Sequence, residues 1–476
     1  FPERITKIGL GWPTLTAMLS HLGPRTDWIS FGAARLCGVL TAPIAYAALR
    51  RLSQDRRVAL FGAGLLVALP FQIALATGDD AQPAALMLLL AGLSHFADYA
   101  DNGRRLSFAL AAPCLVLMVH TRLDTGFMLF AILVLVVQPR AFVALVRRDA
   151  LMLATAGLAT AVFTRVAIAP DIERCLPYPS PPEVLREALN AVTLFPAMGM
   201  HFTKEVTLLG DAPDPAATRF EEISWVPVVV LPLLWSGWGL TLFSGRGARL
   251  LVALLIARIP AYVSLNVGGT DYLGSRHFIG AFPLLCLVTA TGAVALGQKL
   301  GRAAPLIAAC GLALFVAEAQ PPLRYRFAFQ EEYAFLRRTI TALPEGAAVA
   351  HIDFEFGLSP WESSLRLLRP DILWIDFANL SSQTTRFAYL GPDCAALQDI
   401  SIEQATQQYL DRADRIAMLT NLRNRCQLFV RLPARRVLAQ ESVSRHGHGP
   451  SIGIGPRLPV RLVELAPPSD ASPAHE

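Results

Sequence analysis

The chain has 476 residues, of which 53% are hydrophobic and 17% are charged, whereas soluble domains have about 45–50% apolar and ~25% charged residues. Its 42 Lys and Arg residues exceed its 37 Asp and Glu residues by only a few, and the basic side chains lie in short clusters between apolar runs. This composition argues against nucleic acid as a partner and indicates a protein embedded in lipid.

Apolar runs along the first two thirds of the chain predict ten membrane-spanning helices, because a crossing needs ~20 mostly apolar residues. The fourth and fifth runs are too short to cross alone, so we expect them to tilt, to meet water early, or to continue through the polar segment 120–124. In chain order the predicted spans are residues 30–49, 58–76, 82–97, 106–119, 125–137, 150–168, 226–243, 249–265, 278–296 and 303–318.

The distribution of Lys and Arg among the connections predicts the orientation. Basic residues in short loops resist translocation and remain in the cytoplasm. They are concentrated in alternate connections, namely 50–57, 98–105, 138–149, 244–248 and 297–302, and are sparse in the opposite loops. We therefore expect residue 1 and everything after about residue 318 to lie outside, in the periplasm of a bacterial inner-membrane protein. One further helix upstream of Phe1 would return the N-terminus to the cytoplasm.

After the membrane domain, assigned to residues 1–319, the pattern changes. Short β-type runs at 348–354, 371–377, 415–419, 427–432 and 460–465 alternate with helical runs such as the amphipathic segment 331–343. Ser401 followed by Gln404 is a capping-box signature for another helix. Residues 320–476 are thus predicted to form a small periplasmic α/β domain.

The cysteines divide between these two parts. Thiols in apolar spans behave as small hydrophobes, and we interpret Cys37, Cys114, Cys286 and Cys310 in that way. Cys394 and Cys426 both belong to the soluble domain, so an oxidising compartment would make them the natural disulfide pair. The alternative is two unpaired thiols in the core of that domain.

Ionisable residues gather at the predicted outer ends of the spans, where they are functional candidates because charge at membrane depth is costly. Paired carboxylates can orient an attacking hydroxyl or hold a divalent cation, and Arg or His can neutralise a phosphate leaving group. The clusters are Asp79 with Asp80, His120 with Arg122 and Asp124, Asp271 with Arg276 and His277, and the long loop 170–225 with His201, Lys204 and Glu205.

Structural roles remain open for three of these clusters. Asp79 and Asp80 could cap the next helix, since Asp is a favoured N-cap residue. Arg122 and Asp124 could form an ion pair, and Arg276 with His277 could anchor a helix end. No metal site is predicted, because the histidine pair 446 and 448 has no third ligand nearby. The chain contains no Walker loop, GxGxxG, HExxH or GxSxG motif, which argues against nucleotide-driven transport and common hydrolase chemistry.

The order of several short motifs resembles that of the polytopic membrane glycosyltransferases of the GT-C fold, such as protein mannosyltransferases and aminoarabinose transferases. The resemblance extends from about residue 11 to residue 296. The matching pieces are Gly11-Trp12-Pro13-Thr14-Leu15, Ala33-Ala34-Arg35-Leu36, Ala68-Leu69-Pro70 leading to Gly78-Asp79-Asp80, Thr121-Arg122-Leu123-Asp124-Thr125-Gly126, and Arg276-His277-Phe278 with Pro283-Leu284-Leu285.

This resemblance implies inverting transfer of a sugar from a polyprenyl-phosphate donor to an acceptor at the outer face of the membrane. Asp79 or Asp80 would match the acid of the second outer loop and orient the acceptor or a divalent cation. Arg276, with His277, Arg122 and Lys7, would contact the donor phosphate. The family's principal carboxylate lies in the first outer loop, where the visible acids are Glu3 and Asp27, so we expect that residue upstream of Phe1.

Two other classes of function remain open from the sequence. A lipid or polysaccharide transporter or flippase would carry ionisable residues along the midplane of several spans, and a non-catalytic envelope-assembly protein would use its outer domain to bind a partner. The sequence leaves the sugar, the acceptor, metal dependence and oligomeric state undefined.

Overall fold

The structure is a computed structural model. It describes residues 11–22, 28–76, 81–136, 180–193, 226–242, 245–265, 279–303, 320–352, 362–376, 386–391, 434–444 and 457–465, together with isolated residues between 147 and 158 and between 306 and 313. The chain divides into two compact units, one made of Phe1–Leu22 and Ser30–Leu323 and the other of Gly23–Ile29 and Arg324–Glu476. Each unit is described by itself.

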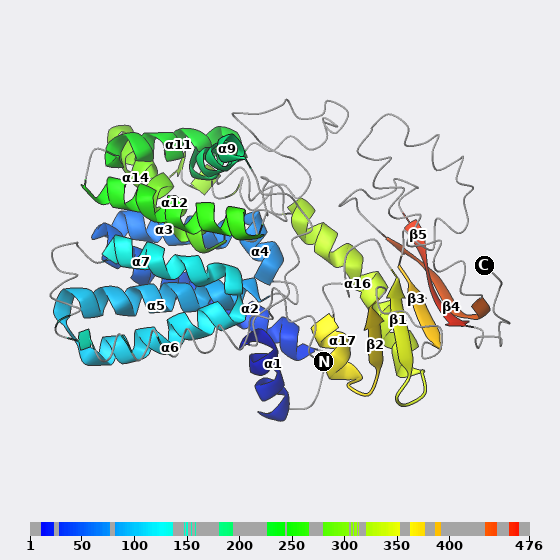
Figure 1. Cartoon of the computed structure of the whole chain (residues 1–476). Helices are drawn as coiled ribbons and strands as arrows, with labels where there is room; N and C mark the ends of the chain where they lie inside the picture. The colour runs from blue at the N-terminus through cyan, green and yellow to red at the C-terminus, as the bar shows by residue number, and fades with distance from the viewer. Residues whose placement is uncertain are drawn as a thin grey trace. The chain divides into compact units, whose positions relative to one another are not determined.

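The first unit is a bundle of helices (Figure 1). Its elements are α1 (Gly11–Leu22), α2 (Trp28–Ser53), α3 (Arg56–Ala68), α4 (Pro70–Ala76), α5 (Gln82–Asn102), α6 (Arg105–Thr121), η1 (Leu123–Gly126), α7 (Phe127–Val136), α9 (Pro181–Thr193), α11 (Val226–Thr241), α12 (Gly245–Leu265), η3 (Ile279–Ala281), α14 (Phe282–Leu300) and η4 (Gly301–Ala303).

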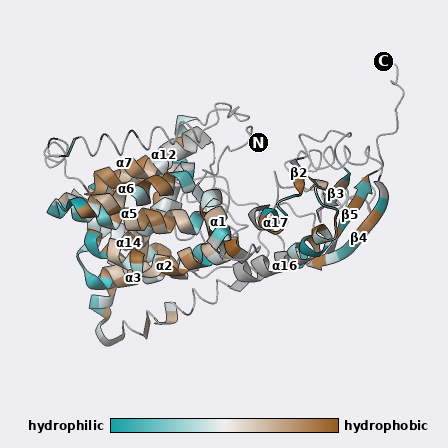
Figure 2. Cartoon of the chain, turned by 90° about the horizontal axis from the view of Figure 1, so that it is seen from below, coloured by the Kyte–Doolittle hydropathy of each residue, from teal (hydrophilic) through white to brown (hydrophobic). Residues whose placement is uncertain are grey.

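Among the described residues, three helices of the bundle are long and apolar enough to cross a membrane. They are Ile29–Ser53, Gln82–Asn102 and Phe282–Leu300, and each overlaps a predicted span. Figure 2 shows apolar residues along the bundle helices and hydrophilic ones toward helix ends. Large apolar side chains such as Val39 and Leu106 are 70% and 73% exposed, as expected for surfaces that face lipid. These features are compatible with a membrane protein.

The other predicted spans correspond to helices that are not among these three, or lie outside the described residues. The spans predicted at 106–119, 125–137, 226–243 and 249–265 overlap α6 with 17 residues, α7 with 10, α11 with 16 and α12 with 21. Most of segments 150–168 and 303–318 is not among the described residues. The predicted span 58–76 is divided into α3 and α4 at Leu69, whose φ of −57° and ψ of 122° are not helical. Pro70 explains this break, because proline lacks an N–H and disfavours helical backbone in the residue before it.

A network around Asp98 joins several helix ends. The carboxylate of this buried residue accepts hydrogen bonds from Arg51 Nη1 at 2.9 Å, from Asn102 Nδ2 at 2.8 Å and from the Ser107 hydroxyl. The neighbouring Tyr99 donates its hydroxyl hydrogen to Asp149. The end of α2, the α5–α6 turn and residue 149 therefore lie at the same end of the bundle. Residues of the basic connections 50–57, 98–105 and 138–149 thus lie together. This agrees with the prediction that these connections share one side of the membrane.

The second unit is an α/β fold. Its elements are α16 (Gln320–Thr341), β1 (Ala348–Ile352), α17 (Glu362–Leu368), β2 (Leu373–Asp376), β3 (Phe387–Leu390), β4 (Ala434–Ser444) and β5 (Arg457–Leu465). The strand order is β2-β1-β3-β5-β4; β1 pairs in parallel with β2 and β3, and β5 pairs antiparallel with β3 and β4. The predicted strands at 348–354, 371–377 and 460–465 are confirmed, β3 and β4 were not predicted, and segments 415–419 and 427–432 lie outside the described residues.

Helix α16 belongs to the core of this fold through its last turns. Phe335, Leu336 and Ile340 are fully or almost fully buried, and Tyr389 of β3 donates a hydrogen bond to Glu332, whose side chain is also buried. A buried carboxylate needs such partners because an unpaired polar group loses its hydration without compensation. The predicted amphipathic segment 331–343 is thus confirmed as the part of α16 that packs in the core.

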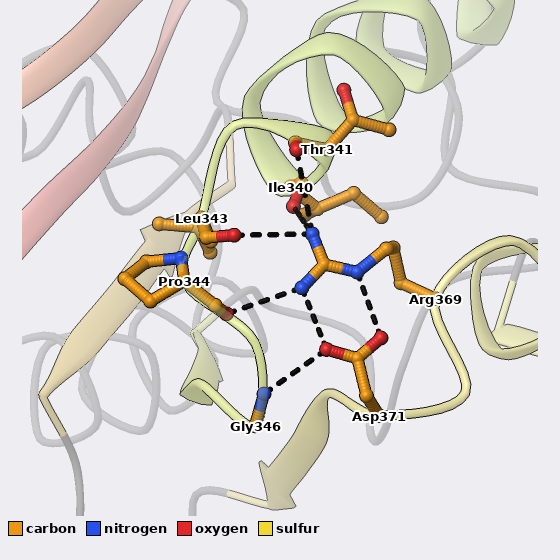
Figure 3. Close-up of polar contacts among 7 residues, drawn as sticks. All are labelled: Ile340, Thr341, Leu343, Pro344, Gly346, Arg369 and Asp371. Carbon is orange, nitrogen blue, oxygen red and sulfur yellow. Dashed lines mark hydrogen bonds and ion pairs between the residues drawn. The ribbon is translucent and has the colours of Figure 1, made fainter.

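The end of α16 is held by a single guanidinium (Figure 3). Arg369 donates hydrogen bonds to the carbonyl oxygens of Ile340 at 2.7 Å, Leu343 at 3.2 Å and Pro344 at 3.1 Å, and it forms two with the Asp371 carboxylate, at 2.8 and 2.6 Å. The last carbonyls of a helix have no partner within the helix. Arg369 donates to Ile340 O in the last turn of α16 and to the carbonyls of Leu343 and Pro344 just after it.

Candidate functional site

The structure describes only part of the predicted site. His120 and Arg122 are described with their side chains, and Asp124 is described through its backbone in η1. The candidates outside the described residues are Lys7, Asp79, Asp80, Arg276, His277, Cys394 and Cys426. The predicted disulfide and the second-loop acids therefore stay predictions, and the described part of the predicted site lies at the end of α6.

Arg122 is a buried cation at the end of an apolar helix. Its side chain and that of His120 are each 6% exposed. Helix α6 ends at Thr121, and Arg122 is extended, with φ −147° and ψ 110°, while its N–H donates to Met118 O at 2.9 Å. The Thr125 hydroxyl donates to Arg122 O at 2.6 Å. The sequence Thr121-Arg122-Leu123-Asp124-Thr125-Gly126 thus forms a tight helix end that fixes the backbone of the arginine.

The beginning of α1 lies against this helix end (Figure 1). A Cβ atom placed on Gly11 would lie 2.7 Å from both His120 C and Thr121 N, closer than side-chain carbons approach backbone atoms. Only glycine permits this contact. The glycine of the Gly11-Trp12-Pro13 motif is therefore explained by its packing on the residues that precede Arg122.

The next residue, Trp12, connects α1 with α2 and α5. It is buried in a small cluster with Ala33, Ala34 and Cys37 of α2 and with Ala81 and Ala84, which follow Asp80 in sequence. Small side chains on α2 and α5 leave room for the indole ring. Three of the motifs that carry the family resemblance, those at 11–15, 33–36 and 121–126, consequently meet at one end of the bundle.

Several buried polar groups were not among the predicted site residues. Trp12 Nε1, Ser30 Oγ and both amide atoms of Gln72 are buried without a hydrogen-bond partner, as is Trp374 Nε1 in the second unit. Most buried polar groups in proteins are paired, so each exception requires an explanation such as a bound ligand or water. Trp12 belongs to the motif Gly11-Trp12-Pro13. Ser30 and Gln72 had only a weak signal in the sequence, because each is a single polar residue within an apolar run.

We use the name Arg122 site for Gly11, Trp12, Ser30, His120 and Arg122. All of its polar side chains can donate a hydrogen bond, and the arginine carries a full positive charge that does not titrate near neutral pH. Such a set suits an anion that presents several oxygen acceptors. Among the described residues, no group of three His, Cys, Asp or Glu side chains is arranged to hold a metal ion.

The buried ionisable residues of the described bundle occupy its two ends. Asp98 and Asp149 belong to the Asp98 network, and His120 and Arg122 belong to the Arg122 site. Helices α5 and α6 run between these ends. The Asp98 carboxylate accepts hydrogen bonds from the side chains around it. We therefore interpret Asp98 as a structural residue that connects helix ends.

Comparisons of the chain with protein-family models and with curated proteins found no match.

Proposed function

We propose that this protein is a membrane glycosyltransferase that moves a sugar from a polyprenyl-phosphate donor to an acceptor at the outer face of a bacterial inner membrane. The observation that carries the proposal is the burial of Arg122 at the end of an apolar bundle, against the Gly11-Trp12 segment. A buried charge of this kind is costly and is retained mainly where it serves function. The phosphate of a lipid-linked sugar carries the negative charge that a cation at this place attracts.

In the proposed reaction an acceptor hydroxyl attacks the anomeric carbon of the sugar. The new carbon–oxygen bond forms as the bond to the lipid phosphate breaks, and the bonding electrons leave with the phosphate. Arg122, together with Arg276, His277 and Lys7, stabilises the charge that grows on this leaving group. Asp79 or Asp80 orients the acceptor or a divalent cation, and the hydroxyl proton passes to a carboxylate.

The placement of charge favours this function over that of a flippase. Transporters commonly bind their substrates near the middle of the membrane, where ionisable side chains then line the path. In the described part of the bundle, the buried ionisable residues lie at the helix ends, in the Asp98 network and the Arg122 site. A chemical site at one rim agrees better with this distribution than does a transport path through the bundle.

The test uses the purified chain in lipid nanodiscs with a radiolabelled polyprenyl-phosphate sugar and a panel of acceptors. We expect label to leave the lipid and free polyprenyl phosphate to accumulate. Arg122→Gln should lower turnover about 100-fold, the scale seen when one charge-stabilising donor is lost from an active site.

Arg104→Gln provides the matched control, because Arg104 precedes the other end of the same helix and is exposed. Its turnover should equal that of the unmodified chain. Equal activity of both variants would exclude Arg122 from the site. Lipid movement in a vesicle flux assay, without release of lipid phosphate from any donor, would identify a transporter instead.

A further inference from the structure

Two neutral donors of the Arg122 site point to a ligand that presents only acceptors. We infer that the Trp12 indole N–H and the Ser30 hydroxyl bind the phosphate oxygens of the lipid substrate beside Arg122. The choice of a lipid phosphate rests on the proposed function. The assignment of these two residues rests on their burial and on their lack of partners.

The two side chains lie on adjoining surfaces of α1 and α2. Trp12 is 3% exposed and packs on Ala33 and Ala34. Ser30 is 0% exposed and precedes these alanines by three and four residues on α2, which places it on the same helix face, one turn away. The α1–α2 contact therefore brings an indole N–H and a hydroxyl to the same end of the bundle.

A second contact of α1, with the end of α6, connects Trp12 and Ser30 with the buried charge. Gly11, adjacent to Trp12, meets the backbone of His120 and Thr121, and Arg122 is the next residue. The short segment Gly11-Trp12 is thus in contact with α6 on one side and with α2 on the other. Arg122, Trp12 and Ser30 therefore belong to three elements that meet at this end of the bundle.

The hydrogen-bonding chemistry selects among ligands. An indole N–H and a guanidinium can only donate, and a serine hydroxyl can also donate. A phosphate monoanion or dianion offers several acceptor oxygens to such a set, and hydrogen bonds to a charged acceptor are about twice as strong as neutral ones. The hydroxyls of a sugar would find no acceptor for their own hydrogens on the indole or the guanidinium, and only Ser30 Oγ could accept one. The set therefore matches the phosphate better than the sugar.

The absence of partners in the structure also predicts how variants behave. A buried donor without an acceptor destabilises the folded chain, and removing it is neutral or stabilising. Trp12→Phe keeps an aromatic ring against Ala33 and Ala34 but removes the N–H. Ser30→Ala removes the hydroxyl at nearly constant volume. Ser30→Ala should not lower the melting temperature of the chain without ligand, whereas Trp12→Phe also loses buried ring volume and should lower it slightly.

The experiment measures binding of polyprenyl phosphate, and of polyprenol as its uncharged counterpart, to the full chain in nanodiscs. We expect the unmodified chain to bind the phosphate more tightly. Trp12→Phe and Ser30→Ala should each weaken binding of the phosphate about tenfold, as expected for the loss of one hydrogen bond to a charged group, and should leave binding of polyprenol unchanged. Ser20→Ala is the control, because this hydroxyl on α1 already donates to Ala17 O at 2.6 Å.

The outcomes separate this inference from the proposed function. Variants that bind polyprenyl phosphate as tightly as the unmodified chain would overturn the inference, even if sugar transfer occurs. An unmodified chain that binds the phosphate and the alcohol equally would overturn it as well. Phosphate binding that depends on Trp12 and Ser30, in a chain that transfers no sugar from any donor, would support the inference and contradict the proposed function.

Discussion

Gly11 and His120 are in backbone contact, and this contact joins the first helix of the bundle to the turn that carries Arg122. Any side chain at position 11 would come within 2.7 Å of the carbonyl carbon of His120. The Arg122 site therefore depends on a residue that contributes no side chain to it. This dependence gives the first prediction.

Gly11→Ala should separate α1 from the end of α6. The added methyl group would meet backbone atoms of α6, which move only if one of the two helices moves. We expect the free energy of unfolding to fall by about 1–3 kcal/mol, the usual cost of overpacking, and turnover to fall with it. Thermal unfolding in nanodiscs and the transfer assay measure the two effects. Gly32→Ala is the control, since a Cβ at Gly32 meets nothing within 4 Å; similar losses in both variants would argue against the contact.

A second prediction concerns the packing of α11 on α14. A Cβ on Gly237 would lie 1.9 Å from Val288 O, and one on Gly292 would lie 2.0 Å from Leu233 O. Glycines allow helix backbones to approach closely in membranes. Gly237→Ala should therefore lower the melting temperature of the chain in nanodiscs, whereas Gly239→Ala on the same helix, with open space around its Cβ, should not. A destabilisation of equal size in both would show that helix propensity, and not packing, is responsible.

The third prediction concerns the stability of the α/β unit as a function of pH. The hydrogen bonds from Arg369, and then that from the Gly346 N–H, hold the pKa of Asp371 below its ordinary value, and Asp371 in turn raises the pKa of Arg369. A carboxylate with a lowered folded-state pKa adds stability above its unfolded pKa of about 3.9, and this stability is lost as the pH falls through the folded value.

The free energy of unfolding should therefore fall in acid, below about pH 4, as Asp371 becomes protonated. Asp371→Asn should lack this part of the pH dependence. The difference in stability between the unmodified chain and Asp371→Asn should be largest at neutral pH and should vanish at low pH. Arg369→Ala should cost on the order of 2 kcal/mol, because it also removes the side-chain donors to the carbonyls of Ile340, Leu343 and Pro344. Circular dichroism of the melting transition at several pH values measures these effects. A pH-independent difference would contradict the assignment.

The fourth prediction places Asp79 and Arg276 on the same side of the membrane. In a chain whose native cysteines are replaced, Asp79→Cys and Arg276→Cys should both react with a membrane-impermeant maleimide added to intact spheroplasts. Asp101→Cys, in the turn next to the Asp98 network, should react only after permeabilisation. Labelling of Asp79→Cys and Arg276→Cys from opposite sides would exclude a shared site for the two residues.

The parts of the fold that hydropathy dominates could be predicted from sequence. The expected starts of the spans that became α2, α5 and α14 fall within four residues of the observed helices, because a long apolar run leaves the chain few alternatives. The break at Leu69 was not predicted, since a hydropathy window averages over a single proline. Strand β3 has only four residues, and β4 carries charged side chains along an edge of the sheet, so neither gives a clear apolar alternation.

The candidate site was predictable to a smaller extent. His120 and Arg122 stood out because charged residues interrupt an apolar sequence. Ser30 and the polar edge of Trp12 did not, because the lack of a hydrogen-bond partner is a property of the packed bundle and not of local sequence. The role of Gly11 likewise depends on the distant residue His120, which a single sequence does not connect to it.

The break before Pro70 has a consequence for the path of the chain. Leu69 interrupts the helix between α3, which packs on α14 through contacts such as that of Gly62 with Cys286 O, and the seven residues of α4. Leu69 and Leu75 are both fully buried in the core of the bundle. The short helix α4 is therefore held by its own packing in the core and is not a simple extension of α3.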